Sequence, residues 1–337
     1  MVTIGVPRAL LYYIYFPMWQ RFLTDLGCKV VLSPPTNERI LNLGTQATVD
    51  EVCAPVKVAF GHVLDLADKV DYVFVPRLVS VEPRAYICPK LMGLPDMVKH
   101  SGNKMPELLS PDVDLSRGKM SIARALSEAR HTLGKSVWPT LRAFYLSLGE
   151  NHKVEQRLMS GLTPEEAFHG TAWRRTPGVR MKVAVLGHPY NVYDPVLSMS
   201  LIEQLRRSGV DVVTAEMLPQ HKIDVGLQGL SKELFWTLSK KVLGAGLYFV
   251  KTPREVDGII VLSSFGCGLE SLIADLLERN ARRSEFPFMH LIGDEHSGEA
   301  GVVTRVEAFI DMVKGRSEHA SNISSHGNLQ HRPTSTT

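Results

Sequence analysis

The sequence predicts an α/β protein built from two doubly wound, Rossmann-like domains with parallel sheets. Short, continuous runs of apolar residues are typical of strands that are buried on both faces of such a sheet. A strand–helix–strand pattern also begins each half of the chain, and the separation from Gly5 to Gly27 equals that from Gly187 to Gly209. Two βαβ units are therefore expected, one at the start of each half.

The first half is predicted to alternate strands and helices. The apolar runs of strand length lie next to turns that contain proline or glycine, and the intervening stretches have the helical spacing of apolar residues. In order, the expected elements are strand 2–7, a helix to residue 26, strand 29–32, helices 37–43 and 56–66, and strand 70–76.

The second half repeats this order and adds further strands. Its apolar runs are again continuous, which favours a parallel sheet covered by helices. In order, the expected elements are strand and turn 181–189, helix 197–207, strand 210–213, helix 230–243, strand 256–262, helix 270–279, strand 288–292 and helix 304–313.

The segment between the halves shows helical patterns, at 122–133 and 138–148, and no clear strand. The last residues are polar and contain almost no large apolar side chain, so they cannot bury enough surface to become ordered. The expected division is an N-terminal Rossmann-like domain at 1–110, a helical bridge at 111–178, a C-terminal Rossmann-like domain at 179–316 and a disordered tail at 317–337.

The composition excludes some classes of function. The net charge is only +3, with acids interspersed among the bases, so a nucleic-acid surface is not expected. The apolar stretch at 9–19 is interrupted by a proline and is too short to cross a bilayer, so we expect a core helix and no membrane association. Four cysteines without a secretion signal suit the reducing cytoplasm, where thiols stay free.

Three of the four cysteines are expected at turns or helix starts. A proline follows Cys53 and Cys88 within two residues, and glycines flank Cys267. Helix dipoles and free backbone N–H groups stabilise thiolates at such positions, which makes these sulfurs good iron ligands. The alternative is that they are small buried hydrophobic residues, because free cysteines often are and these three lie far apart in the sequence. No Cys-x-x-Cys pair occurs, so neither a zinc ribbon nor a ferredoxin-type site is indicated. Cys28, beside a predicted core strand, is expected to be structural.

Ligands of open parallel sheets bind beyond the carboxyl ends of the strands, where all three cysteines are predicted to lie. A cleft between the halves would bring them together. The sequence contains neither the Gly-x-Gly-x-x-Gly fingerprint nor a phosphate-binding loop. It therefore lacks the motifs that usually indicate dinucleotide binding or nucleotide hydrolysis.

Other polar residues near the strand ends have both a functional and a structural interpretation. Glu295 and His296 are candidates for proton transfer or metal binding, and a polar loop tip explains them equally well. His188 is a further catalytic candidate, although turn histidines are common. Lys57 and Lys90 would balance the charge of a bound cluster, or they are ordinary surface lysines.

A set of motifs resembles one known superfamily. As a group these motifs are similar to those of the 2-hydroxyacyl-CoA dehydratases and the proteins related to their activases, a superfamily that includes the double-cubane cluster proteins. The resemblance extends over most of residues 1–316. The motifs are IGVPRAL at 4–10, SPPTN at 33–37, DEVCAPVK at 50–57, GHV at 61–63, YICPK at 86–90, FGCG at 265–268 and DEHSGEAG at 294–301.

The resemblance implies a cofactor, a partner and a class of chemistry. In the dehydratase subunits three cysteines hold a 4Fe-4S cluster, or one cubane of a double-cubane cluster, in the cleft between two Rossmann-like domains. The matching residues are Cys53, Cys88 and Cys267. A separate ATP-dependent activase would reduce the cluster under anaerobic conditions. Because this chain has no phosphate loop, it would receive electrons and pass them to a small substrate, such as an acyl-CoA.

The type of function stays open at this point. The resemblance would make the protein a dehydratase-like lyase or a cluster-dependent reductase component, within a homo- or heterodimer. One alternative is a non-enzymatic binding or regulatory partner of an activase, with a cluster that serves only structure. Another is an ordinary small-molecule-binding α/β protein in which the three thiols are incidental.

Overall fold

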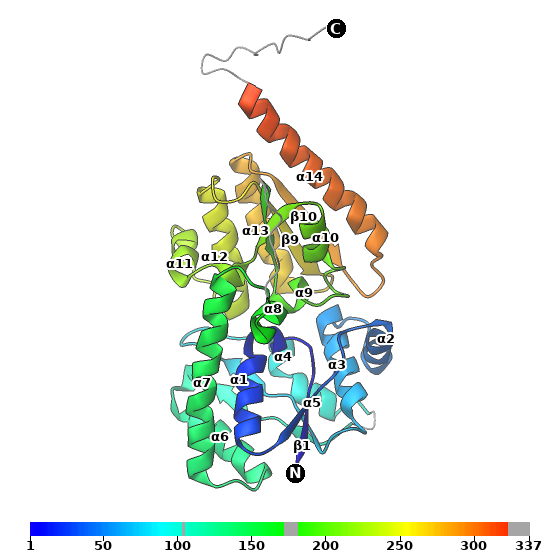
Figure 1. The fold of residues 1–337 in the computed structure, drawn as a ribbon, viewed down its shortest axis with the longest axis vertical. Coiled ribbons are helices and arrows are strands. Elements are labelled where there is room, and N and C mark those ends of the chain that lie inside the picture. Colours follow the sequence, from blue (N-terminus) through cyan, green and yellow to red (C-terminus); the bar gives the residue numbers. More distant parts are fainter. Residues whose placement is uncertain (103–104, 172–180, 323–337) are drawn as a thin grey trace.

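The computed structural model describes residues 1–102, 105–171 and 181–322 of the chain. Two α/β halves are stacked along the long axis, with the first half below and the second half above (Figure 1). All paired strands of the three sheets are parallel. The α/β class and the two parallel-sheet halves that the sequence predicts are therefore confirmed.

The first sheet has the strand order β2-β1-β3-β5, so its first strand lies inside the sheet. Ile4 pairs with Val30 on one side and with Tyr72 on the other. The strands are β1 (Thr3–Val6), β2 (Lys29–Leu32), β3 (Tyr72–Phe74) and β5 (Leu108–Leu109).

The second sheet has the order β10-β9-β7-β8 and repeats the arrangement of the first, with β7 between two neighbours. Every residue of β9 is buried, which explains the apolar run at 259–262. The strands are β7 (Met181–Leu186), β8 (Val210–Val213), β9 (Gly258–Ser264) and β10 (Phe288–Gly293).

In the first half, α2 and α3 pack at unusually short distance. A Cβ atom on Gly44 would lie 1.7 Å from the carbonyl oxygen of Lys57, so only glycine permits this approach. Almost all of α3 is buried as a result. The helices are α1 (Tyr12–Asp25), α2 (Glu38–Ala47), α3 (Ala54–Leu66), α4 (Pro89–Met92) and α5 (Leu94–Lys99).

In the second half, the helix expected at 230–243 begins later and extends further. The segment before it is held by the other half, because Tyr86 N–H donates to Phe235 O at 2.7 Å and Thr237 N–H donates to Tyr86 O at 3.0 Å. The helices are α9 (Pro189–Val192), α10 (Leu201–Arg207), η2 (Ala215–Met217), α11 (Gln220–Leu227), α12 (Thr237–Lys251), α13 (Gly268–Arg283) and α14 (Glu299–Asn322).

The middle segment is mainly helical, as expected, but it does contain a strand. Strand β6 (Asp112–Asp114) pairs with β4 (Arg77–Ser80), and Arg77 forms ion pairs with Asp112 at 2.8 Å and Asp96 at 2.7 Å. Such a short, polar strand carries little apolar pattern in its sequence. The helices are η1 (Leu115–Arg117), α6 (Met120–Thr132), α7 (Val137–Met159) and α8 (Pro164–His169), and residues 172–178 of the expected bridge lie outside the described part.

Helix α14 packs against the second half over its first turns and then continues beyond it to Asn322 (Figure 1). It therefore includes residues 317–322 of the segment that was expected to be disordered, because the helix begun by the apolar residues before it continues through them. The rest of the expected tail, 323–337, lies outside the described residues.

Among the helices that the structure describes, none is both long and apolar enough to cross a membrane.

Candidate functional site

The three predicted cysteines occupy equivalent positions, because each immediately precedes a helix. Cys53 is the N-cap of α3, Cys88 of α4 and Cys267 of α13. Prolines in the first turn of α3 and α4 favour helix initiation at these points. The turn locations expected from sequence are confirmed, and each thiol lies beside the positive end of a helix dipole.

The loops that carry the three thiols approach one another around a single carbonyl group. Lys90 Nζ, on the Cys88 helix, donates a hydrogen bond to Glu51 O at 3.3 Å, in the loop before Cys53. Gly266 also approaches this oxygen, since a Cβ atom there would lie 4.0 Å from it. Gly266 has a φ of +74°, which glycine adopts readily, and so turns the chain into Cys267. Loops from both halves therefore meet here.

The thiols also lie within one electrostatic environment. Burial raises the pKa of Cys53, the Lys90 charge lowers it, and the Cys88 and Glu270 charges raise it. Burial likewise raises the pKa of Cys267, with further contributions from Glu270, Cys53 and Cys88. The structure thus places the three thiols where the charge of each influences the others. With this burial and mutual repulsion, Cys53 and Cys267 favour the protonated form at neutral pH.

Cys28 lies apart from this group. It is buried in the core of the first half, just before β2. Burial raises its pKa, and Lys135 is the charged group that lowers it. Neither Cys53, Cys88 nor Cys267 contributes to this shift, in keeping with the structural role expected for Cys28.

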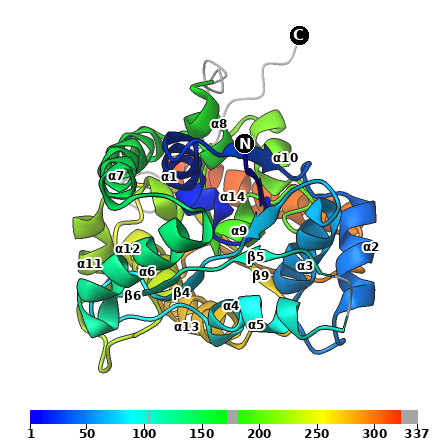
Figure 2. The same cartoon turned by 90° about the horizontal axis from the view of Figure 1, so that it is seen from below.

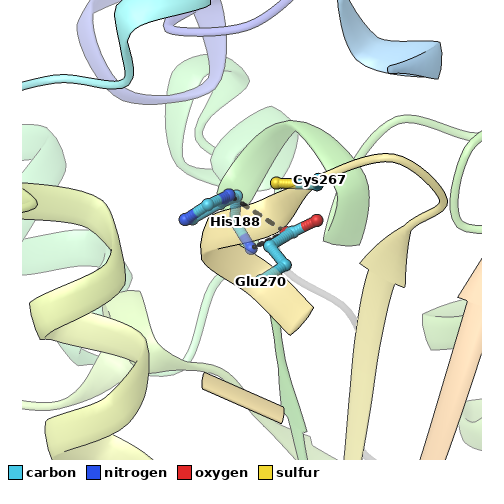
Figure 3. Close-up of side chains that lie close together, drawn as sticks. All are labelled: His188, Cys267 and Glu270. Atoms are coloured by element: carbon cyan, nitrogen blue, oxygen red, sulfur yellow. Dashed lines mark hydrogen bonds and ion pairs between the residues drawn. The ribbon is translucent and has the colours of Figure 1, made fainter. Parts of the chain in front are cut away.

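Glu270 fixes the turn that carries Cys267 (Figure 3). Its buried carboxylate accepts hydrogen bonds from Ser264 N–H at 2.8 Å and from His188 N–H at 3.1 Å, at the ends of β9 and β7. Asn191 Nδ2 donates to both of its oxygens, at 2.7 and 2.8 Å. One carboxylate therefore joins two strand-end turns of the second half.

The imidazole of His188 completes this buried network. Its Nδ1 lies 3.0 Å from Glu270 Oε1 and 2.8 Å from the hydroxyl of Tyr190, and its Nε2 lies 3.2 Å from Ser239 Oγ. His188, Cys267 and Glu270 each place one potential ligand atom within 4.8 Å of the others, and all three are buried (Figure 3). Such nitrogen, sulfur and oxygen donors suit a transition metal.

Glu270 carries a negative charge in this buried place. Burial alone would raise its pKa, but the charge of His188 and the hydrogen bonds from His188 and from Ser264 N–H hold its pKa below the usual value. Glu270 is not among the site residues that the sequence predicts. The available signal was its position three residues after Cys267, where an acidic side chain often closes the first turn of a helix.

The candidates Glu295 and His296 lie in the loop after β10. The carboxylate of Glu295 forms an ion pair with Lys57, whose side chain is only 1% exposed and which lies one turn after Cys53 on α3. Burial would raise the pKa of Glu295, but Lys57 lowers it by hydrogen bonding and by its charge. His296 is exposed, and its N–H donates to Asp294 at 2.9 Å. Glu295 thus connects the halves, and His296 belongs to a polar turn.

A second buried contact between the halves surrounds Asp194. Its side chain accepts hydrogen bonds from Tyr13, at 3.2 Å, and from Thr36. Because the Thr36 hydroxyl donates to Asp194, His62 Nε2 must be the donor in its 3.0 Å contact with Thr36. Burial lowers the pKa of His62 to about 3, so this ring is neutral. The motifs SPPTN and GHV contain Thr36 and His62, but the sequence did not predict that these distant segments form a network with Asp194.

The fold and the site together define a class of protein: two parallel-sheet halves with three helix-capping thiols where they meet. Residues 3–218 match the family described as the CoA enzyme activase uncharacterised domain (DUF2229). This match covers more than half of the chain, and the chain belongs to that family. The matched segment includes Cys53 and Cys88 and ends before Cys267. No curated protein matches the chain.

Proposed function

We propose that this protein is an iron–sulfur protein of the 2-hydroxyacyl-CoA dehydratase-like superfamily. It would accept low-potential electrons from an ATP-dependent activase and pass them to a small substrate, such as an acyl-CoA thioester. The observation that supports the proposal is that the loops of Cys53, Cys88 and Cys267, from both halves, approach one another and that the charges of these thiols influence one another.

The donor set fits such a cofactor. Iron–sulfur clusters are held by cysteine thiolates, and three of them leave one iron of a cubane without a protein ligand. Burial and mutual repulsion keep Cys53 and Cys267 protonated in the free protein, so a bound cation would be needed to stabilise them together as thiolates. Lys90 supplies one compensating positive charge to Cys53.

When bound, a 4Fe-4S cluster, or one cubane of a double-cubane cluster, supplies low-potential one-electron chemistry. The chain's own residues would hold and shield it. Glu270 fixes the Cys267 turn, and the ion pair between Lys57 and Glu295 holds the halves together beside Cys53. The low exposure of Cys53 and Cys267, at 7% and 9%, would keep water from the sulfurs.

The proposed partner follows from the family and from the sequence. The family description refers to activases of CoA enzymes. This sequence contains no phosphate-binding loop that would bind ATP and drive electron transfer by its hydrolysis. A separate ATP-hydrolysing protein would therefore deliver the electrons, and the two proteins would contact each other near the junction of the halves.

Anaerobic purification followed by iron and sulfide analysis and electron paramagnetic resonance tests the proposal. We expect bound iron and sulfide in the wild-type protein and their loss in each of the single variants Cys53→Ser, Cys88→Ser and Cys267→Ser. The matched control Cys28→Ser should keep its iron. A wild-type protein that remains free of iron after cluster reconstitution would exclude the proposal.

The second candidate is a non-enzymatic partner of an activase, in which a cluster has a structural role. The low exposure of Cys53 and Cys267 favours it, because a substrate needs access to the metal. Tight binding of the activase by the reduced protein, together with no turnover of acyl-CoA thioesters, would select this candidate.

A further inference from the structure

A cavity of about 270 Å³ lies in the first half, away from the thiols. Helices α1, α6 and α7 and strands β3, β4 and β6 contribute its walls. In Figure 2 α7 lies beside α1, and α6 lies below them in the same part of the molecule. No cysteine lines the cavity, and none of the residues assigned above to the candidate site does so.

Aromatic side chains form much of the wall. Trp19, Phe22, Phe74 and Phe144 all line the cavity, and the first three are at most 9% exposed. The rings of Trp19 and Phe74 are 5.3 Å apart and inclined at 72°, an edge-to-face arrangement. Such walls offer both ring faces and ring edges, which a flat aromatic ligand would contact favourably.

One polar atom in the wall lacks a partner. Asn151 Oδ1 is buried and has no hydrogen bond among the described residues, while its Nδ2 donates to Glu155 at 2.9 Å. This contact directs the amide nitrogen toward Glu155 and leaves the oxygen as a free acceptor. Leu148, one turn earlier on α7, also lines the cavity and is 42% exposed, so the cavity reaches the surface near Asn151.

We propose that this cavity binds a small aromatic molecule that carries one hydrogen-bond donor. The ring system would lie between Trp19, Phe74 and Phe144, and the donor would bond to Asn151 Oδ1 near the mouth. A cavity of about 150 Å³ is known to hold benzene, so the space here suits one or two fused rings. This site is independent of the proposed iron–sulfur function, and its test requires no cluster.

Isothermal titration calorimetry with 2-naphthol tests the proposal on the full-length protein. We expect saturable binding at one site. The matched ligand 2-methoxynaphthalene, which has no donor, should bind about three- to tenfold more weakly, the loss expected for one hydrogen bond. Absence of 2-naphthol binding would overturn the proposal, and equal or tighter binding of 1-decanol would overturn the assignment to an aromatic ligand.

Variants locate the binding. Ala129 is 2% exposed and lines the cavity, so Ala129→Phe should fill it and abolish binding. Ala125→Leu is a smaller filling substitution in case the first variant does not fold. Asn151→Leu should remove the preference for 2-naphthol over its ether, whereas Trp138→Ala, at an exposed position of α7 outside the cavity wall, should leave binding unchanged. Unaltered binding in a folded cavity-filling variant would overturn the proposal.

Discussion

At the scale of single residues, Glu270 is a buried carboxylate on which several hydrogen-bond donors depend. Backbone N–H groups from two strand-end turns and the amide of Asn191 all donate to its carboxylate, in a place that is 3% exposed. Buried donors without an acceptor are costly. The position of Cys267, three residues before it, therefore depends on this one side chain.

We expect Glu270→Ala to lower the free energy of unfolding by about 3 kcal/mol, because it leaves Ser264 N–H and His188 N–H without their acceptor. Chemical denaturation measures this loss. Cys267 should also react faster with iodoacetamide in the metal-free protein, as followed by mass spectrometry. The control Glu278→Ala, on the same helix in an exposed ion pair, should change both values little.

His62 should make stability dependent on pH. Its pKa is about 3 in the folded protein and about 6.5 in an unfolded chain, so between these values only the unfolded state binds the proton. Its contribution is present above pH 6.5 and is lost as the pH falls toward 3. The free energy of unfolding should decline by about 1.4 kcal/mol per pH unit from this residue alone.

The variant His62→Gln isolates this effect, since its amide can still donate to Thr36. Asp194 has a raised pKa because it is buried, and it contributes with the opposite sign. Both proteins contain Asp194, so its effect cancels in the comparison. Urea denaturation between pH of about 6 and 4 should show a shallower decline for His62→Gln. Parallel pH profiles would contradict the assignment of a neutral, buried ring.

At the scale of elements, most strands and helices could be predicted from the sequence. Strands β1, β7 and β9 are largely apolar because most of their residues are buried on both faces of a sheet. Strand β6 is short and polar, and the start of α12 depends on hydrogen bonds to Tyr86, which lies far away in the chain. The pattern of neighbouring residues in the sequence does not show which distant residues will form such hydrogen bonds.

The same distinction applies to the candidate site. The helix-start positions of Cys53, Cys88 and Cys267 follow from neighbouring prolines and glycines, so local sequence predicts them. Glu270 and Asp194 acquire their partners only when segments far apart in the sequence pack together. Their importance could not be read from their own surroundings in the chain.

The close contact between α2 and α3 can be tested by comparing two glycine-to-alanine substitutions. Gly44→Ala should destabilise the protein by about 3 kcal/mol or more, because the new methyl group would overlap the backbone of Lys57. Gly149→Ala, within α7 and with open space where its methyl group would lie, should instead stabilise it by about 0.5–1 kcal/mol. Thermal denaturation of the two variants measures both changes, and shifts of the same sign would contradict this packing.

At the scale of the whole molecule, buried polar contacts hold the two halves together. Lys57 of the first half pairs with Glu295 of the second, and Tyr13 and Thr36 of the first half bond to Asp194 of the second. Buried ion pairs contribute little net stability, but removal of one partner leaves a charge without compensation. The relative position of the halves should therefore be sensitive to single substitutions here.

We expect Glu295→Gln to lower the free energy of unfolding by about 2 kcal/mol, since it leaves the buried ammonium of Lys57 unpaired. The double variant Lys57→Met with Glu295→Gln should recover most of this loss. Asp275→Asn, which breaks an exposed ion pair with Arg279, serves as the control and should cost less than about 0.5 kcal/mol. A double variant as unstable as Glu295→Gln alone would contradict this account.

The central place of β7 in its sheet also sets a minimum length for an independently folding fragment. Residues 3–218 include β7 and β8 but not β9, which forms the other neighbour of β7. A polypeptide shortened to that segment would present a bare, apolar strand edge to solvent, and such edges promote self-association. Recombinant work on this family should therefore retain the chain at least through β10.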